Sequence, residues 1–232
     1  MNNGHKIPLQ RRARLSHEKE GRRQDILASA FNLFETKAYN DLTLAGIAEG
    51  CGLAKGTIYI YFNTKEEIFL ELVESRLLGW FEALDEGLRP AGGGLFLEPI
   101  APAALTRLIL DSLEAQPQLA RLLGILHTVL EPNVERLVAL RFREFLADRC
   151  LRTGRLLEQR MLFLEEGQGA ELLLRVHALI LGCWQLSDPP PPVRALLQSP
   201  GLQIFDVPFR PRFESTFRAL LEGMDSLRMK QA

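Results

Sequence analysis

The sequence predicts an all-α protein with a small helical module near the N-terminus and a larger helical body after it. Leu, Ala, Glu and Arg are abundant while aromatic residues make up only 8% of the chain, a composition that favours helix. Apolar residues recur at helical spacing, and no stretch shows the two-residue alternation of a strand. At 232 residues, the chain is long enough to bury a substantial core.

The first twenty residues are polar and charged and show no periodicity, so we expect a mobile basic arm over 1–20. Up to Lys65 the chain carries ten basic and six acidic residues, although its net charge is −1. An excess of positive charge is typical of a surface that meets a polyanion, but a basic tail without a partner would show the same excess. Charges also occupy the place of a signal peptide's apolar segment, so we expect a cytoplasmic protein.

Three short helices are expected after the arm. From Arg22 to Lys37 the apolar residues lie three and four positions apart, as on an amphipathic helix. Thr43 is a good N-cap for a second helix over 44–50. Gly52 is free to take the positive φ of a tight turn, and a third helix follows at about 54–61. Two short helices joined by a glycine turn have the form of a helix-turn-helix.

The third helix has two different sides. On a helical wheel Ala54, Ile58 and Phe62 share one face, which we expect to be core. The other sides carry small, aromatic and cationic residues that suit the major groove of B-DNA. Glycine allows close approach, threonine and isoleucine contact base edges or methyl groups, and tyrosine and lysine contact phosphates. The alternative is a small helical subdomain with a polar face.

The stretch TLAGIAEGCGLAKGTIYIYFNTKEEIF resembles the N-terminal DNA-binding module of the TetR family of bacterial transcriptional regulators. The resemblance covers about 22–72, and KGTIYIYFNTKEE is its most specific part. It implies that three helices contact operator DNA and that a fourth joins them to a ligand-binding, dimer-forming body. The DNA contacts that it implies are Thr43, Lys55, Gly56, Thr57, Tyr59, Ile60, Tyr61 and Lys65.

Two residues depart from the family pattern. Ala38 stands where members usually have glycine after the first helix, and a positive φ at this alanine would cost on the order of 1 kcal/mol. The turn is therefore expected to be built differently. Ala54 stands where many members have a serine that caps the recognition helix, and the loss of that cap costs roughly 1 kcal/mol.

The fourth helix should start at a capping box formed by Thr64 and Glu67 and run over 65–88. A linker rich in proline and glycine, RPAGGGLFLEP, follows it. Further helices are expected at about 103–115, 118–130, 134–160, 170–186 and 211–228, with four consecutive prolines forming an extended connector before the last. The expected domains are an arm (1–20), a helix-turn-helix domain (21–66) and a ligand-binding and dimerisation domain (67–232).

The last two long helices are the candidate dimer interface, because the resemblance implies a dimer built from a four-helix bundle. The helix over 170–186 is apolar around its whole circumference, as in a helix buried on all sides. Both helices could instead close the core of the monomer. The residues expected at the interface are Leu172, Val176, Leu179, Ile180, Cys183, Phe213, Phe217, Leu220, Leu221 and Met224.

A pocket is expected among the middle helices, since ligand pockets are mostly apolar with a few polar anchors. An apolar or amphipathic small molecule is the expected effector, although each polar candidate could also have a purely structural role. The residues expected to line the pocket are Ile109, Leu126, His127, Phe142, Phe145, Arg149, His177 and Trp184.

Other classes of function lack their signatures. No nucleophile elbow, HExxH motif, phosphate-binding glycine loop or acidic cluster is present, so we expect no enzyme, metal or cofactor. The three cysteines show no paired spacing. The most apolar run, 172–186, is too short to span a bilayer, and the basic arm lacks aromatic residues for a membrane surface. A DNA-binding adaptor or architectural protein, or an activator, without a small-molecule effector is the remaining alternative.

Overall fold

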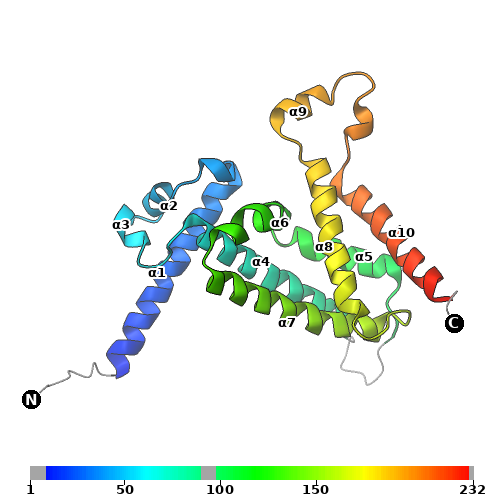
Figure 1. The fold of residues 1–232 in the computed structure, drawn as a ribbon, viewed down its shortest axis with the longest axis horizontal. Helices are drawn as coiled ribbons and strands as arrows, with labels where there is room; N and C mark the ends of the chain where they lie inside the picture. Colours follow the sequence, from blue (N-terminus) through cyan, green and yellow to red (C-terminus); the bar gives the residue numbers. More distant parts are fainter. Residues whose placement is uncertain (1–8, 90–97, 230–232) are drawn as a thin grey trace, which may run out of the picture. The chain divides into compact units, whose positions relative to one another are not determined.

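The computed structural model describes residues 9–89 and 98–229, and every regular element in this part of the chain is a helix (Figure 1). The all-α prediction is therefore confirmed. Two compact units divide the chain, Met1–Leu72 and Val73–Ala232. The helices are α1 (Leu9–Thr36), α2 (Leu44–Gly50), α3 (Lys55–Ile58), α4 (Lys65–Leu88), α5 (Pro102–Glu114), α6 (Leu119–Ile125), α7 (Arg136–Arg160), α8 (Gln168–Ser187), α9 (Pro191–Leu196) and α10 (Phe209–Met229).

The structure differs from the predicted arm over 1–20, because α1 already begins at Leu9. Arginine, lysine, glutamate and leucine are frequent in this stretch and have high helix propensity. Gln24 Nε2 also donates a hydrogen bond to the Glu20 carboxylate one turn earlier, at 2.9 Å. The missing amphipathic period therefore does not exclude a helix in this part of the chain. Residues 1–8 lie outside the described residues.

The first unit packs its short helices around the second half of α1. Ser29 is buried and its hydroxyl donates to the carbonyl of Ile47 (2.8 Å), which fixes α2 against α1. Ala38 has φ −66° and ψ 147°, so the turn after α1 needs no left-handed residue. The core residues of this unit include Ile26, Ala30, Phe34, Ile47, Ile58, Phe62, Ile68 and Phe69.

In the second unit α7 and α8 touch through their backbones. In Figure 1 the two helices meet at the short connection between them. A Cβ atom added to Gly169 would lie 2.1 Å from the carbonyl oxygen of Gly154, and one added to Gly154 would lie 2.5 Å from the nitrogen of Ala170. No side chain fits at either position without moving a helix.

A buried carboxylate joins α4 to α7. Asp85 is 3% exposed; one of its oxygens accepts a hydrogen bond from the Thr153 hydroxyl (2.6 Å), and the other lies 2.9 Å from Nε of Arg152. A buried charge is costly unless it is paired and hydrogen-bonded. Because Asp85 has both kinds of partner, it favours one register of the two helices.

The helix expected over 118–130 changes character half-way. After α6 the residues Leu126–Leu130 form a π-helical turn, and Glu131–Asn133 form a 3₁₀ turn that contains Pro132. Proline removes a backbone donor, so the α-helical pattern cannot pass through it. This irregular stretch places His127 beside α8.

The segment between α8 and α10 is also partly helical. The four prolines do not form the expected extended connector throughout, because Pro191 and Pro192 open the short helix α9. Proline suits the first helical positions, where its missing N–H is not needed. This segment exposes several large apolar side chains, namely Val193, Leu196, Leu202, Ile204 and Phe205.

Candidate nucleic-acid interface and ligand cavity

One side of α3 and of the turn that follows it is open to solvent. Tyr59 and Ile60 are 50% and 65% exposed, and Lys55 and Gly56 are also exposed. On the opposite side Ile58 is fully buried. Ile58 and Phe62 are buried as the helical wheel predicts, but Ala54, which the wheel places on the same face, is exposed, because it has an extended backbone and lies before the helix. The helix α3 is also shorter than predicted and ends at Ile58.

The remaining predicted contacts surround this surface. Thr43 is exposed and its hydroxyl caps α2 by accepting a hydrogen bond from Gly46 N (3.1 Å). Thr57 and Tyr61 are half-buried. Ala54, the residue before α3, makes no side-chain cap, so the first N–H groups of α3 remain available for an anion such as phosphate.

Lys65 has a structural role in addition to any contact with DNA. Its ammonium group donates to the carbonyls of Tyr39 (3.2 Å) and Leu42 (3.1 Å) and lies 4.3 Å from the centre of the Tyr39 ring. The Tyr39 hydroxyl in turn donates to the Glu66 carboxylate (2.8 Å). Burial is the main cause that raises the pKa of Tyr39, and the hydrogen bond to Glu66 is the second. The phenol therefore stays protonated.

Arg23 is a positioning residue that the sequence did not reveal. Its guanidinium donates to the Glu71 carboxylate and to the carbonyl of Tyr61 (3.1 Å), and it lies 4.2 Å from the centre of the Phe62 ring. These contacts hold the end of the exposed segment against the start of α4. The partners are far apart in sequence, so no local pattern could have shown them.

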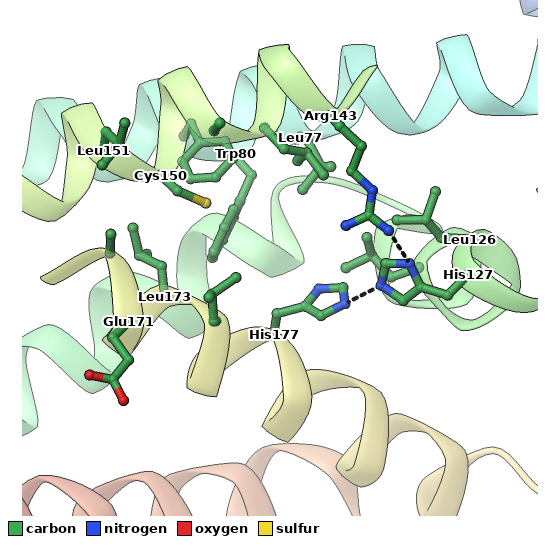
Figure 2. Close-up of a pocket in the computed structure, with 16 residues that line it drawn as sticks. Leu77, Trp80, Leu126, His127, Arg143, Cys150, Leu151, Glu171, Leu173 and His177 are labelled. Atoms are coloured by element: carbon green, nitrogen blue, oxygen red, sulfur yellow. Dashed lines mark hydrogen bonds between the residues drawn. The ribbon is translucent and has the colours of Figure 1, made fainter. Parts of the chain in front are cut away.

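The second unit contains a cavity of about 560 Å³, within the range of roughly 300–1,000 Å³ that is typical of small-molecule sites. Figure 2 shows side chains from α4, the π-helical turn, α7 and α8 around it. Its walls are almost entirely apolar. The residues that line it are Leu77, Trp80, Phe81, Leu123, Leu126, His127, Arg143, Leu146, Ala147, Cys150, Leu151, Ala170, Glu171, Leu173, Leu174 and His177.

A cluster of polar side chains lies at one end of the cavity (Figure 2). Nε2 of His127 lies 3.1 Å from Nε2 of His177, and Nδ1 of His127 lies 2.7 Å from the Glu131 carboxylate. Arg143 donates to both oxygens of Glu131, at 2.5 and 2.6 Å. Burial is the main cause that lowers the pKa of His177, to about 4, and the neighbouring His127 and Arg143 lower it further, so His177 is neutral near pH 7.

Of the predicted pocket residues, Leu126, His127 and His177 line this cavity. Ile109 and Phe142 are buried elsewhere in the core, and Phe145 stacks beside Phe142 and under the Arg149 guanidinium. Trp184 lies in a separate hollow with Phe209. An apolar helix face shows which residues avoid water, but the packing of the helices decides which of them border a void.

Both compact units match profiles of known protein families. The profile described as "Tetracyclin repressor-like, C-terminal domain" matches residues 74–227, and that of "Bacterial regulatory proteins, tetR family" matches residues 26–72. The chain belongs to the TetR family. The two matched segments fall in the two compact units, respectively the second and the first.

Individual relatives of this TetR-family chain match it over short segments. An uncharacterized HTH-type transcriptional regulator, YfiR of Bacillus subtilis, is 34% identical over 71 residues, which is 31% of each chain. The HTH-type transcriptional regulator EthR of Mycolicibacterium smegmatis is 37% identical over 55 residues, 24% of this chain and 25% of that one. The matched segment thus spans about a third or less of these relatives.

A solved structure of a TetR-family transcriptional regulator from Marinobacter aquaeolei VT8 also resembles the chain. It is 21% identical, covers 87% of this chain and 98% of its own, and has a TM-score of 0.46.

The predicted dimer residues of this TetR-family chain lie mostly inside the monomer. The structure buries seven of them, and Leu179, Leu220 and Met224 are half-buried or exposed at the edge of the core. The buried seven pack α8 and α10 into the core of the second unit, so they cannot form a flat surface for a partner. The seven are Leu172, Val176, Ile180, Cys183, Phe213, Phe217 and Leu221.

The described residues contain neither a metal cluster nor a membrane-spanning helix. Within 9–89 and 98–229 no group of three or more His, Cys, Asp or Glu side chains is arranged to hold a metal ion. In the same part of the chain no helix has the length and hydropathy to cross a membrane.

Proposed function

We propose that this TetR-family protein is a DNA-binding transcriptional repressor that acts as a dimer on a palindromic operator and is released by a small-molecule ligand in the cytoplasm. The observation that carries the proposal is the exposed side of α3, where a glycine, a tyrosine and an isoleucine face solvent above a buried core. Ile60, just after α3, is exposed in this structure, and on DNA a base methyl group or sugar would cover it. The profile of a repressor-like C-terminal domain supports the sign of regulation.

The cavity supports control by a ligand. Its size and its apolar walls are those of a typical small-molecule site. Leu77, Trp80 and Phe81 of α4 line it, and the same continuous helix begins at Lys65 beside the DNA-facing residues. A ligand that favours one position of α4 would shift the population between DNA-binding and released states, by no more than its difference in affinity for the two.

The operator can be identified by selection from a pool of random DNA duplexes with the full-length protein. The pool should become enriched in a two-fold symmetric sequence whose halves lie about 34–36 Å apart or a multiple of that. Fluorescence anisotropy with this duplex should show affinity that falls steeply with salt. The Tyr59→Ala variant should bind it more weakly while remaining dimeric. Failure to enrich any sequence would contradict the proposal.

We place the dimer surface on the faces of α8 and α10 that the monomer leaves open. On α8 this face carries the exposed residues Ala178 and Gly182; on α10 it carries Ala219, Gly223 and Leu227. A Cβ atom added to either glycine would meet no atom within 4 Å. Glycine inside an exposed helix costs about 0.5–1 kcal/mol relative to alanine, and the monomer does not need it there. A second helix that packs closely against this face would need it.

Replacing either glycine with a large residue should therefore weaken dimerisation. We expect Gly182→Leu or Gly223→Leu to raise the dissociation constant of the dimer about a hundredfold, which corresponds to roughly 2.7 kcal/mol. Sedimentation velocity over a range of protein concentrations measures this change. Gly21→Leu in α1 is the matched control, since Gly21 is also exposed with open space around it. Unchanged sedimentation of both test variants would place the interface elsewhere.

A further inference from the structure

We propose that the cavity of the second unit binds an amphipathic monocarboxylate, with its head group held by His127, His177 and Arg143 and its apolar body between α4, α7 and α8. The inference rests on the proposed function, because it names the chemical class of the ligand that would release DNA. The inference follows from the arrangement of charge in the polar cluster, in which the basic side chains border the cavity and the acidic Glu131 does not.

The side chains that border the cavity at its polar end are all hydrogen-bond donors or potential cations. His127, Arg143 and His177 line the void, whereas Glu131 does not. The Glu131 side chain is only 11% exposed and accepts hydrogen bonds from Arg143 and His127 on its outer side. Glu131 therefore orients the basic side chains without bordering the cavity. A head group that enters the cavity contacts the basic side chains.

The hydrogen bonds between the two histidines define a site for one added proton. Nδ1 of His127 has two neighbours, the Glu131 carboxylate at 2.7 Å and the Arg143 guanidinium at 3.4 Å. Because a carboxylate can only accept and lies much closer, we assign the proton of the neutral ring to Nδ1, which leaves Nε2 of His127 as an acceptor. The neutral His177 then donates its Nε2–H to that atom, at 3.1 Å. If a proton is added to His127, the direction reverses: His127 donates, His177 accepts, and Nδ1 of His177 becomes a donor for a ligand oxygen.

Charge balance favours the binding of an anion together with the uptake of one proton by the histidine pair. Within the cluster the negative Glu131 and the positive Arg143 compensate one another. A bound carboxylate adds one negative charge to this balanced cluster, and a proton on the histidine pair compensates it. A cationic head group would instead be repelled by Arg143, which borders the cavity.

The other charged groups around the cavity do not compete for the head group. Glu171, which also lines the void, is exposed on α8 and forms an ion pair with Arg175 at 2.5 Å. Burial raises the pKa of the Cys150 thiol, so this part of the α7 wall remains uncharged. The residues contributed by α4, namely Leu77, Trp80 and Phe81, do not titrate. Apart from Glu171, which is paired with Arg175, the polar cluster is the charged part of the cavity wall among the described residues.

Three ten-carbon probes distinguish the possible head groups: decanoate, decan-1-ol and decylamine. Trp80 lines the cavity, so its fluorescence reports binding in a Trp184→Phe background, in which Trp80 is the remaining tryptophan of the two. We expect decanoate to bind at least tenfold more tightly than either other probe at about pH 6. Its affinity should fall as the pH rises towards about 8, by at most tenfold per pH unit for one proton, while that of decan-1-ol stays constant.

Variants of the cluster test the assignment. His177→Leu and Arg143→Gln should each weaken decanoate binding tenfold or more and leave decan-1-ol unaffected. Arg155→Gln, which removes a charge from an exposed position on the same helix as Arg143 and does not border the cavity, should change neither. Decanoate that fails to bind at about 1 mM, equal binding of decylamine or decan-1-ol, or unchanged decanoate binding by both cluster variants would overturn the inference.

The DNA-binding assay separates this inference from the proposed function. If decanoate binds as expected and the selected duplex is released, both hold. If decanoate binds and the duplex stays bound, the ligand class holds and ligand-controlled release fails. If no duplex is bound by the protein without any probe, the regulator assignment fails whatever the cavity binds.

Discussion

Replacing Gly56 with glutamate should abolish operator binding, with at least a hundredfold loss of affinity. Gly56 lies on the exposed side of α3, and a Cβ atom added to it would meet nothing within 4 Å. The fold therefore accepts the side chain, and helix propensity even improves. A carboxylate at this point would face the phosphates, and its bulk would keep the helix from the groove.

A charge of the same sign elsewhere provides the control for Gly56→Glu. Ser199→Glu adds one carboxylate to an exposed position of the second unit. Fluorescence anisotropy with the selected duplex should show binding by Ser199→Glu close to that of the parent protein, with circular dichroism confirming that both variants are folded. Equal affinity of Gly56→Glu and Ser199→Glu would show that α3 does not enter the groove.

The largest loss of stability is expected for Gly169→Ala. A Cβ atom there would lie 2.1 Å from the carbonyl oxygen of Gly154, and the backbone of α7 cannot turn aside as a flexible side chain can. Overpacking of this kind typically costs about 1–3 kcal/mol or more. For a protein of this size that corresponds to a fall in the melting temperature of roughly 2–12 °C.

Another glycine of the second unit makes the comparison specific. Gly124 lies in α6, and a Cβ atom added to it would meet nothing within 4 Å. Gly124→Ala should leave the melting temperature unchanged or raise it slightly, because alanine favours helix. Thermal unfolding followed by circular dichroism compares the two variants. A melting temperature of Gly169→Ala equal to that of the parent would mean that α7 and α8 can move apart without a loss of stability.

Local signals in the sequence predicted the first unit well. The capping box is present, since the hydroxyl of Thr64 accepts from the N–H of Glu67 (3.2 Å) and the Glu67 carboxylate accepts from the N–H of Asn63 (2.8 Å). The bounds of α4 agree with the prediction. The exposed side of the third helix was also predictable from Ile58 and Phe62, which are buried, whereas Ala54 lies outside the helix and is exposed.

The ligand cavity could not be predicted in the same way, because it is formed by residues distant in sequence. Arg143 lies on a polar stretch of α7 that is typical of a solvated surface, and Glu131 has the position of a helix stop before Pro132. Only packing brings both to His127. Hydrophobicity alone likewise could not show which side of α8 is core. Where a helix is apolar around its whole circumference, the elements that pack against it determine which side is core.

The π-helical turn Leu126–Leu130 contains one residue more than an α-helical turn would need. The extra residue can be accommodated at two positions in the backbone. A change from one position to the other rotates the neighbouring side chains by about 100°. His127 sits within this turn. The cavity wall therefore contains one extra residue at this turn. A ligand bound to His127 would favour one of the two positions of that extra residue.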